Sequence, residues 1–437
     1  MKSKDMRKYW IWLSNACGAG SKVAVSLVRH FGNAYEVFKA DEEDYSNCNF
    51  RIDSRVKARL NYKDISDAED IVAWCDNEED VRILCPDDVD YPSALTSMAD
   101  APMVLYVKGT LPDFDNNFTC AVVGTRSMTD YGKRMSHKIG YGLAKCGSCV
   151  ISGIAKGCDA AAMLGAIEAG GTTVAVLGCG IDVVYPPENI DLWPAVLKNG
   201  AIITEYSPGA SPKGSHFPSR NRLISGLSQA VCVTEADMRS GSLITARYAI
   251  YQGKDLFAVP GQADMKNAEG ANFLLKQGAL LVTCAEDILA NFEFLYPHTI
   301  DLKMIDKPVF RDENEEEDIK ILKAKLSEKK KAKSKRKKKK ADNPFPKEEK
   351  TIQNNIDYDM LGEDEKAVYR AMTPEIPMLA DEICTLGGFT ISKVMSALTL
   401  LEIAGAVESG AGGYFIRHAD DEEVGEPSIN EFDSCLE

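Results

Sequence analysis

No apolar run in the chain approaches 18 residues, and the N-terminus is polar and charged. We therefore expect neither a membrane span nor a signal peptide, and we expect a cytoplasmic protein. The chain has only five histidines, at positions 30, 137, 216, 298 and 418. No second C-x-x-C motif stands at zinc spacing from the first. The sequence therefore predicts no metal and no cofactor.

Two common phosphate motifs are also missing. There is no Walker A sequence. No G-x-G-x-x-G follows the first expected parallel strand, because the residues after it are Gly124-Thr125-Arg126-Ser127-Met128. The later Gly178-Cys179-Gly180 opens no immediate helix. Arg126, two residues after a single glycine, would crowd a pyrophosphate that lies flat on the turn. The same arginine could bind a phosphodiester. These absences disfavour a dinucleotide or nucleoside triphosphate site.

Cysteine is frequent, with thirteen residues, but most of them lie inside apolar runs. There they behave as small hydrophobic residues of a reducing compartment rather than as a disulfide framework. The pair Cys146 and Cys149 has C-x-x-C spacing. We interpret it as a helix end, a glycine turn and a strand start.

The length of 437 residues predicts several domains. We expect a small helical domain at 1–75, a Rossmann-like domain at 76–297, a charged linker at 298–355, a winged helix at 356–418 and an acidic tail at 419–437. The net charge is −15, but 119–290 holds 15 basic and 14 acidic residues. The global charge therefore says little about the central domain.

Three segments outside the central domain leave alternatives open. Residues 17–22 resemble a helix–hairpin–helix turn that can hold one phosphate, although a packing or partner-binding module fits too. Ten of the twelve residues at 329–340 are basic, as in a solvated spacer or a nucleic-acid tether. The third helix expected in 356–418 has only Lys393 as a cation, which favours a protein-interaction or dimer role over double-stranded DNA.

Short runs rich in Val, Ile and Ala recur between residues 119 and 290, separated by helix-length stretches. They predict an α/β fold with a doubly wound parallel sheet. We expect an edge strand near 103–107 and helices from about Tyr131, over 158–169, near 220–228 and from 242 to 252. The parallel strands are expected at 119–123, 149–151, 173–177, 201–204, 230–234 and 256–259.

Polar, glycine-containing turns follow three of these strands. Because the turns at the carboxyl ends of parallel strands line one crevice, we expect them to form one site. Backbone amides at such turns favour anions, and Arg126 and Lys156 add full positive charges. The sequence therefore predicts a phosphate site from Gly124, Thr125, Arg126, Ser127, Ser152, Gly153, Lys156, Gly157, Ser240, Gly241 and Ser242.

The loop 214–225 adds cations and flat faces to this edge. Its candidate contacts are His216, Phe217, Arg220, Asn221 and Arg222. Cations with aromatic surfaces are the combination that single-stranded nucleic acids bind. We expect Glu205 and Glu235 to orient loop amides and Asp159 to start a helix, so no residue pattern requires catalysis.

These residues resemble the signature of the DNA-processing protein A (DprA/Smf) family. The similar runs are Val122–Arg126, Ser152–Gly157, Val176–Gly180, His216–Arg222, Arg239–Ala246 and Ala258–Gly261, which span about 82–290 in order. The resemblance implies an extended Rossmann fold that binds single-stranded DNA, dimerises and loads RecA recombinase on incoming strands in natural transformation. It implies Arg126 and Lys156 as principal phosphate contacts, with Thr245 in the site. Cys158 replaces the usual Ile, and the linker is unusually long.

Two other classes of function stay open. A nucleoside-monophosphate glycosidase-like enzyme shares the fold, but its P-G-G-x-G-T-x-x-E run is absent from residues 239–245. A structural adaptor acting through the terminal modules is the third possibility. The absence of the glycosidase run favours the non-enzymatic interpretation.

Overall fold

The computed structural model describes residues 3–305, 316–326, 363–372, 378–403, 407–409 and 414–417. It divides into two compact units, residues 1–342 and 343–437, which are described separately. Within those ranges no helix is both long and apolar enough to cross a bilayer. The twelve described cysteines, Cys146 and Cys149 among them, are free thiols.

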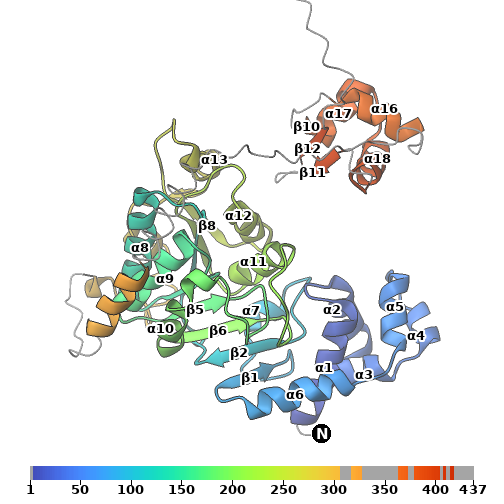
Figure 1. The fold of residues 1–437 in the computed structure, drawn as a ribbon, viewed down its shortest axis with the longest axis horizontal. Helices are drawn as coiled ribbons and strands as arrows, with labels where there is room; N and C mark the ends of the chain where they lie inside the picture. The colour runs from blue at the N-terminus through green and yellow to red at the C-terminus, as the bar shows by residue number, and fades with distance from the viewer. Residues whose placement is uncertain are drawn as a thin grey trace, which may run out of the picture. The chain divides into compact units, whose positions relative to one another are not determined.

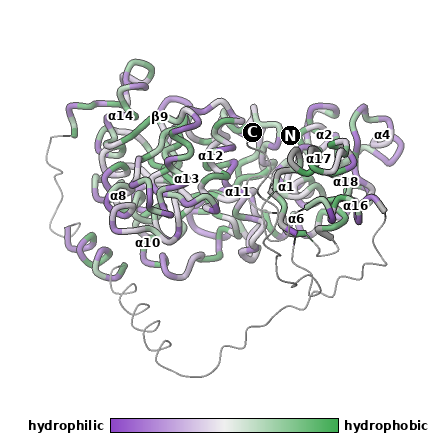
Figure 2. Tube along the Cα trace, turned by 90° about the horizontal axis from the view of Figure 1, so that it is seen from above, coloured by the Kyte–Doolittle hydropathy of each residue, from purple (hydrophilic) through white to green (hydrophobic). Residues whose placement is uncertain are grey.

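Six helices form the N-terminal region, and their shared core includes the buried Trp10, Leu13, Leu27 and Tyr45. The amphipathic spacing of these residues places them on the inner faces. The outlying α4 is hydrophilic and carries three acids in its first turn (Figure 2). The helices are α1 (Ser3–Cys17), α2 (Lys22–Phe31), α3 (Ala34–Lys39), α4 (Glu42–Ser46), α5 (Ser54–Asn61) and α6 (Ser66–Asn77).

A nine-stranded sheet forms the centre of the first unit, in the order β1-β2-β6-β5-β4-β3-β7-β8-β9. In this sheet order, the seven strands from β6 through β3 to β9 run parallel to one another. At one edge, β2 pairs antiparallel with both β6 and β1. The strands are β1 (Val81–Leu84), β2 (Leu105–Gly109), β3 (Thr119–Val123), β4 (Cys149–Ser152), β5 (Thr173–Val176), β6 (Gly200–Thr204), β7 (Ala230–Val233), β8 (Asp255–Ala258) and β9 (Leu280–Leu281).

Helices cover both faces of this sheet (Figure 1). Side chains alternate along β3, so Cys120 and Val122 join the core under α8, whereas Ala121 and Val123 join the core under α11 and α12. The fold is therefore the predicted doubly wound α/β sheet. Its helices are α7 (Ser93–Thr96), α8 (Asp130–Lys145), α9 (Cys158–Glu168), α10 (Leu192–Lys198), α11 (His216–Gly226), α12 (Ser242–Tyr251), α13 (Glu269–Lys276) and α14 (Glu286–Leu289).

The six predicted parallel strands all appear within one residue of their expected ends. Two neighbouring elements differ. The strand expected at the edge is β2, and β1 lies outside it. Helix α11 begins at His216, four residues before the expected start, because Pro218 falls in its first turn, where a missing N–H costs nothing.

Part of the segment expected as an unfolded linker, 298–355, is folded. Residues 316–326 form a helix that buries Leu322 in the main core, and Lys323 pairs with Glu168 of α9 at 2.7 Å. The burial of Leu322 and the ion pair of Lys323 therefore hold this helix against the first unit. The lysine-rich run 329–340 and the acidic tail 419–437 lie outside the described residues.

The described residues of the second unit form three helices and a small antiparallel sheet of order β10-β12-β11, as expected for a winged helix. Val368, Tyr369, Leu398 and Leu401 form its buried core. The guanidinium of Arg417 lies 4.4 Å from the Tyr369 ring centre. The elements are α16 (Glu363–Ala371), β10 (Met378–Leu379), α17 (Ala380–Gly387), α18 (Ile391–Ile403), β11 (Val407–Ser409) and β12 (Tyr414–Arg417).

Candidate nucleic-acid interface

The turns after β3, β4 and β7 meet where the strand order reverses. Strand β3 leads to β4 on one side of the sheet and pairs with β7 on the other. Thr125 N–H donates to the Glu235 carbonyl at 2.7 Å, and Cys158 N–H donates to the Thr125 carbonyl at 3.2 Å. Backbone hydrogen bonds therefore join the three turns at the crevice where open α/β sheets bind ligands.

Close approach explains the glycine at the end of the β4 turn. Gly157 has φ +89°, and a Cβ there would lie 2.3 Å from the Thr125 carbonyl oxygen. Ile154, in the same turn, also has a positive φ of 48°. These two positive φ values shape a sharp turn that brings the segment after β4 against Thr125.

Two buried carboxylates organise the turns. Asp159 accepts the Gly153 N–H at 3.1 Å, and burial raises its pKa against the lowering effect of the Arg220 charge. Glu235 accepts the N–H and the hydroxyl of Thr129 at 2.8 and 2.6 Å. Asp159 thus lies in the first turn of α9, as expected, and also holds a loop amide. Glu235 orients the amide of Thr129, as expected of it.

The two cations proposed as phosphate contacts lie at the mouth of this crevice. Arg126 is exposed, and its guanidinium lies 5.2 Å from the centre of the Phe217 ring. Lys156 is partly exposed and pairs with Glu188 at 2.5 Å. Both cations line a small pocket of about 80 Å³, together with Gly153 and Phe217. Arg220 also lines this pocket, so the structure brings together five predicted site residues from the turns after β3 and β4 and from α11.

Flat side chains gather at the start of α11. His216 stacks on Tyr206, with ring centres 4.1 Å apart and planes inclined by 15°, and its Nδ1 lies 3.1 Å from the Gly178 carbonyl oxygen. Phe217 packs against Tyr185 at 5.2 Å. Tyr206 was not predicted to lie beside His216, because nothing in the local sequence distinguishes it from a core tyrosine that follows a strand.

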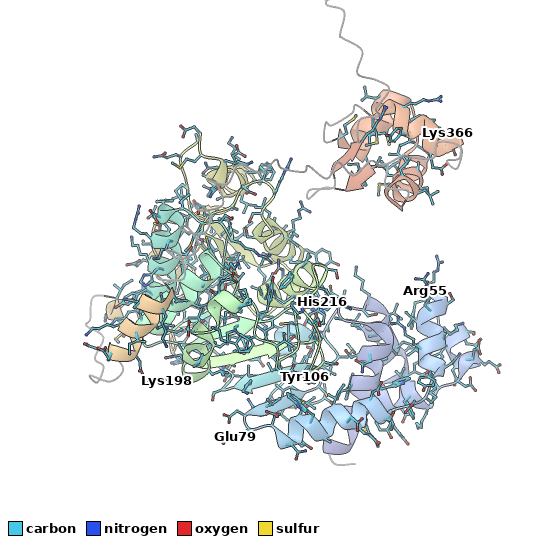
Figure 3. The ribbon with its side chains drawn as sticks, in the orientation of Figure 1. Arg55, Glu79, Tyr106, Lys198, His216 and Lys366 are labelled. Atoms are coloured by element: carbon cyan, nitrogen blue, oxygen red, sulfur yellow. The ribbon has the colours of Figure 1, made fainter. Side chains whose placement is uncertain are left out.

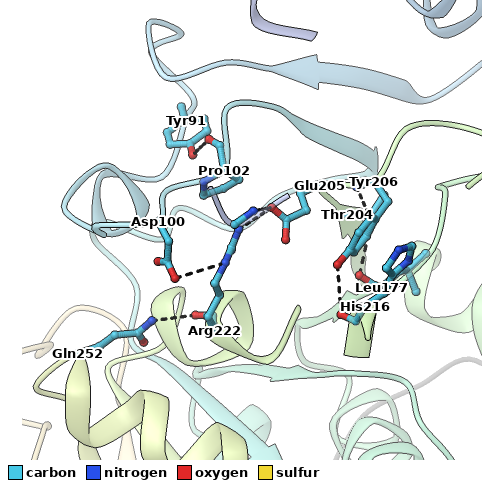
Figure 4. Close-up of polar contacts among 11 residues, drawn as sticks. Tyr91, Asp100, Pro102, Leu177, Thr204, Glu205, Tyr206, His216, Arg222 and Gln252 are labelled. Carbon is cyan, nitrogen blue, oxygen red and sulfur yellow. Dashed lines mark hydrogen bonds and ion pairs between the residues drawn. The ribbon is translucent and has the colours of Figure 1, made fainter. Parts of the chain in front are cut away.

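Arg220 and Arg222 are placed differently from the expectation. Arg220 is 4% exposed, donates to the carbonyls of Gly153 and Val176, and has its pKa lowered to about 10 by burial. Arg222 is 1% exposed and pairs with Glu205 at 2.5 Å (Figure 4). Arg220 nevertheless lines the same small pocket as Arg126 and Lys156, whereas Arg222 does not. Arg220 thus forms part of the crevice wall, and Arg222 joins α11 to the end of β6.

Several predicted hydroxyl contacts are also internal. Ser152 is buried and donates to the Val122 carbonyl at 2.7 Å, and Thr245 is 1% exposed. The side chain of Thr125 is buried and accepts the Ser127 N–H at 3.2 Å. Of this set, Ser127 is exposed. The buried hydroxyls therefore stabilise strand ends and turns.

The turn after β7 is linked to α11. Asn221 donates to the Gly241 carbonyl at 3.2 Å, and the hydroxyl oxygens of Ser240 and Ser242 lie 2.8 Å apart. Gly241 is exposed, whereas both serines are largely buried. The hydrogen bond from Asn221 thus fixes this turn against α11.

The possible helix–hairpin–helix turn faces the sheet domain. Gly20 N–H donates to Glu205 Oε2 at 3.2 Å, so a carboxylate takes the place of a phosphate. Ser207 Oγ is 3.3 Å from Asn15 Oδ1 and 3.4 Å from Tyr106 Oη. Tyr106 and His216 lie on the side of the sheet nearest the N-terminal helices (Figure 3). The turn thus contributes to packing.

Fold and site together define an extended Rossmann-like α/β protein whose glycine turns and two accessible cations meet at the switch point of the sheet. The family model for DNA recombination-mediator protein A matches residues 82–293, and that for the DprA winged helix domain matches residues 357–413. The chain belongs to the DprA/Smf family.

Two relatives and one solved structure illustrate the similarity. Protein Smf of Synechocystis sp. is 35% identical over 292 residues, which cover 65% of this chain and 72% of the relative. DNA processing protein DprA of Streptococcus pneumoniae is 43% identical over 204 residues, with 47% and 72% covered. The X-ray structure of S. pneumoniae DprA has a TM-score of 0.57 at 34% identity, and the match covers 66% of this chain and 98% of that one.

Proposed function

We propose that this protein is a single-stranded DNA-binding recombination mediator. One observation carries the proposal: the exposed Arg126 and the partly exposed Lys156 lie beside glycine turns at the switch point and line one pocket with Phe217, whose ring Arg126 contacts. Amides and cations suit phosphates, while flat rings suit unstacked bases. A single strand offers both chemistries along its length.

The proposed contacts follow from exposure. Arg126 and Lys156 bind phosphates, Phe217 and His216 offer stacking faces, and Ser127 lies at the exposed rim. In this proposal Gly124, Gly153, Gly157, Ser240, Gly241 and Ser242 complete the pocket, with the Gly153 N–H held by Asp159. Arg220, Arg222, Ser152 and Thr245 are buried, and in this proposal they support the pocket, which Arg220 also lines.

The proposed role is to protect incoming single strands and to load RecA recombinase on them during natural transformation, as a cytoplasmic homodimer. Membership in the recombination-mediator family supports this role. We also propose the domain boundaries given above, with the winged helix as a protein-interaction or dimerisation module. The function is non-enzymatic in this proposal, since Asp159, Glu205 and Glu235 all hold hydrogen bonds within the protein.

Binding of a labelled oligodeoxythymidine, followed by fluorescence anisotropy across a salt series, tests the proposal. Three or four phosphate contacts predict a log–log slope of roughly −2 to −3, from about −0.7 per contact. Arg126→Ala/Lys156→Ala should lower the slope by about 1.4. The matched control Arg29→Ala/Lys276→Ala removes the same charge from exposed positions outside the crevice and should bind as wild type.

If the crevice variant binds with unchanged slope, the site is elsewhere. The lysine-rich run 329–340 then becomes the binding segment, and the nucleotide-enzyme alternative returns. If wild type shows no salt-dependent binding at all, the proposed function fails.

A further inference from the structure

A wide groove continues from the crevice between α8, α9 and the helix of residues 316–326. Its volume is about 1,000 Å³, at the upper end of the ~300–1,000 Å³ range of pockets for drug-sized ligands. Figure 1 shows this helix in orange beside α8 and α9. Arg126 and Lys156 line the groove as well as the crevice, so the two spaces are adjacent.

We propose that this groove is a second stretch of the single-strand site, which holds the nucleotides that follow those bound in the crevice. The inference rests on the proposed function and adds to it a binding surface built partly by the helix of 316–326. The occupant is a single-stranded polynucleotide.

Charge supports this occupant. Five cations line the groove against three acids, although the whole chain has a net charge of −15. A local positive excess on an acidic protein selects a polyanion. The acids are Asp130, Glu168 and Glu188, and the cations are Arg126, Lys133, Arg134, Lys156 and Lys323.

The wall opposite the crevice is fixed by identified contacts. Leu322 is 7% exposed in the main core, and Lys323 is half-exposed while its Nζ lies 2.7 Å from Glu168. Glu168 also lies 3.1 Å from Nε2 of His137. Lys323 is thus held at the rim with its charge still accessible to solvent.

The floor is apolar, with Leu164 and Leu326 among its lining residues. His137 also lines the groove, and its ring is nearly parallel to that of Tyr141, at 6.4 Å. An apolar floor with a flat ring accepts base faces, and lysines at the rim accept phosphates. The groove therefore offers both parts of a strand the contacts they need.

The test compares two oligodeoxythymidines, of about five and about twenty nucleotides, the shorter near the lower limit of single-strand sites. Lys133→Ala/Lys323→Ala should leave binding of the short oligomer unchanged. For the long oligomer the salt slope should fall by about 1.4, and affinity at ~0.1 M salt should fall about fivefold per contact, or about 25-fold. The control Lys138→Ala/Lys325→Ala removes equal charge from the same two helices, at positions that do not line the groove.

A further variant separates contact from anchoring. Glu168→Gln removes the carboxylate that pairs with Lys323 but leaves the positive charge of Lys323 in place. Binding of the long oligomer should therefore be at least as tight as in wild type. Equal weakening in Glu168→Gln and Lys133→Ala/Lys323→Ala would mean that Lys323 only anchors the helix, and the inference would be wrong.

The experiment gives different results if the groove does not bind DNA and if the crevice does not bind DNA. If Lys133→Ala/Lys323→Ala binds both oligomers as wild type while Arg126→Ala/Lys156→Ala loses the short one, the groove is excluded and the proposed function stands. If wild type binds neither oligomer, both are excluded.

Discussion

Breaking the buried ion pair between Arg222 and Glu205 by removing one partner is expected to destabilise the protein strongly. The guanidinium is 1% exposed and lies 2.5 Å from Glu205 and 3.7 Å from Asp100. Glu205 also accepts the Gly20 N–H, at 3.2 Å. The pair therefore joins α11, the end of β6 and the N-terminal helices at one buried point.

Glu205→Ala would leave the Arg222 guanidinium buried with only Asp100 near it. Removing one partner of a buried pair costs about 3–5 kcal/mol, because the remaining charge stays desolvated. Stability of a domain is only about 5–15 kcal/mol, so this loss is a large fraction. The partly exposed pair of Lys156 and Glu188 provides the contrast, since Glu188→Ala should cost less than about 1 kcal/mol.

Urea unfolding followed by tryptophan fluorescence measures the change, because all four tryptophans lie in the first unit. We expect a clear fall in the midpoint for Glu205→Ala and recovery of most of it in Glu205→Met/Arg222→Met, which removes both charges. The second variant should also keep the salt slope of DNA binding, since Arg222 does not face the crevice.

Two results would refute the reasoning. A cost below about 1 kcal/mol for Glu205→Ala would mean that water reaches the pair and that Arg222 is not desolvated. A slope reduced by about 0.7 in the folded Glu205→Met/Arg222→Met variant would make Arg222 a phosphate contact, as the sequence first suggested.

Three other predictions concern the turns and the groove. Gly157→Ala should destabilise the protein by more than about 1–2 kcal/mol in thermal unfolding, because φ is +89° and the new Cβ meets the Thr125 carbonyl; a neutral effect would contradict the closeness of the turns. Phe217→Ala should weaken oligomer binding by about 1–3 kcal/mol with an unchanged salt slope, because it removes stacking and no charge; a reduced slope would argue against stacking. Burial acts to raise the pKa of Glu168, but its hydrogen bonds with His137 and Lys323 outweigh burial and lower it. Its contribution to stability is therefore present above pH ~4.5 and lost as the pH falls below that value, and Glu168→Gln should flatten this acid limb of urea unfolding; an unchanged limb would show that the pair contributes nothing.

Much of the architecture was predictable because it depends on local pattern. Apolar runs of four or five residues between helix-length stretches specify buried parallel strands, and β3 to β8 lie within one residue of expectation. Likewise, the switch-point crevice follows from topology, so the meeting of Arg126 with the Gly153–Gly157 turn was predictable before any side chain was placed.

Side-chain burial was not predictable in the same way. Arg220 and Arg222 occur in one loop-like run with His216 and Phe217. The sequence does not show whether an arginine there contacts a phosphate or a carbonyl group of the protein. Their partners are far away along the chain: Val176 for Arg220 and Glu205 for Arg222. Only the packing of α11 against the strand ends decided that they are internal.

The sequence by itself thus determined the strands, the glycine turns and the positions of the two accessible cations, since each depends on residues near one another in the chain. Tertiary structure alone decided which hydroxyls and guanidinium groups are buried and that Gly20 meets Glu205. It also decided that residues 316–326 dock beside the crevice. That docking depends on Leu322 fitting the main core and on Lys323 meeting a carboxylate more than 150 residues away, and no local pattern encodes such a match.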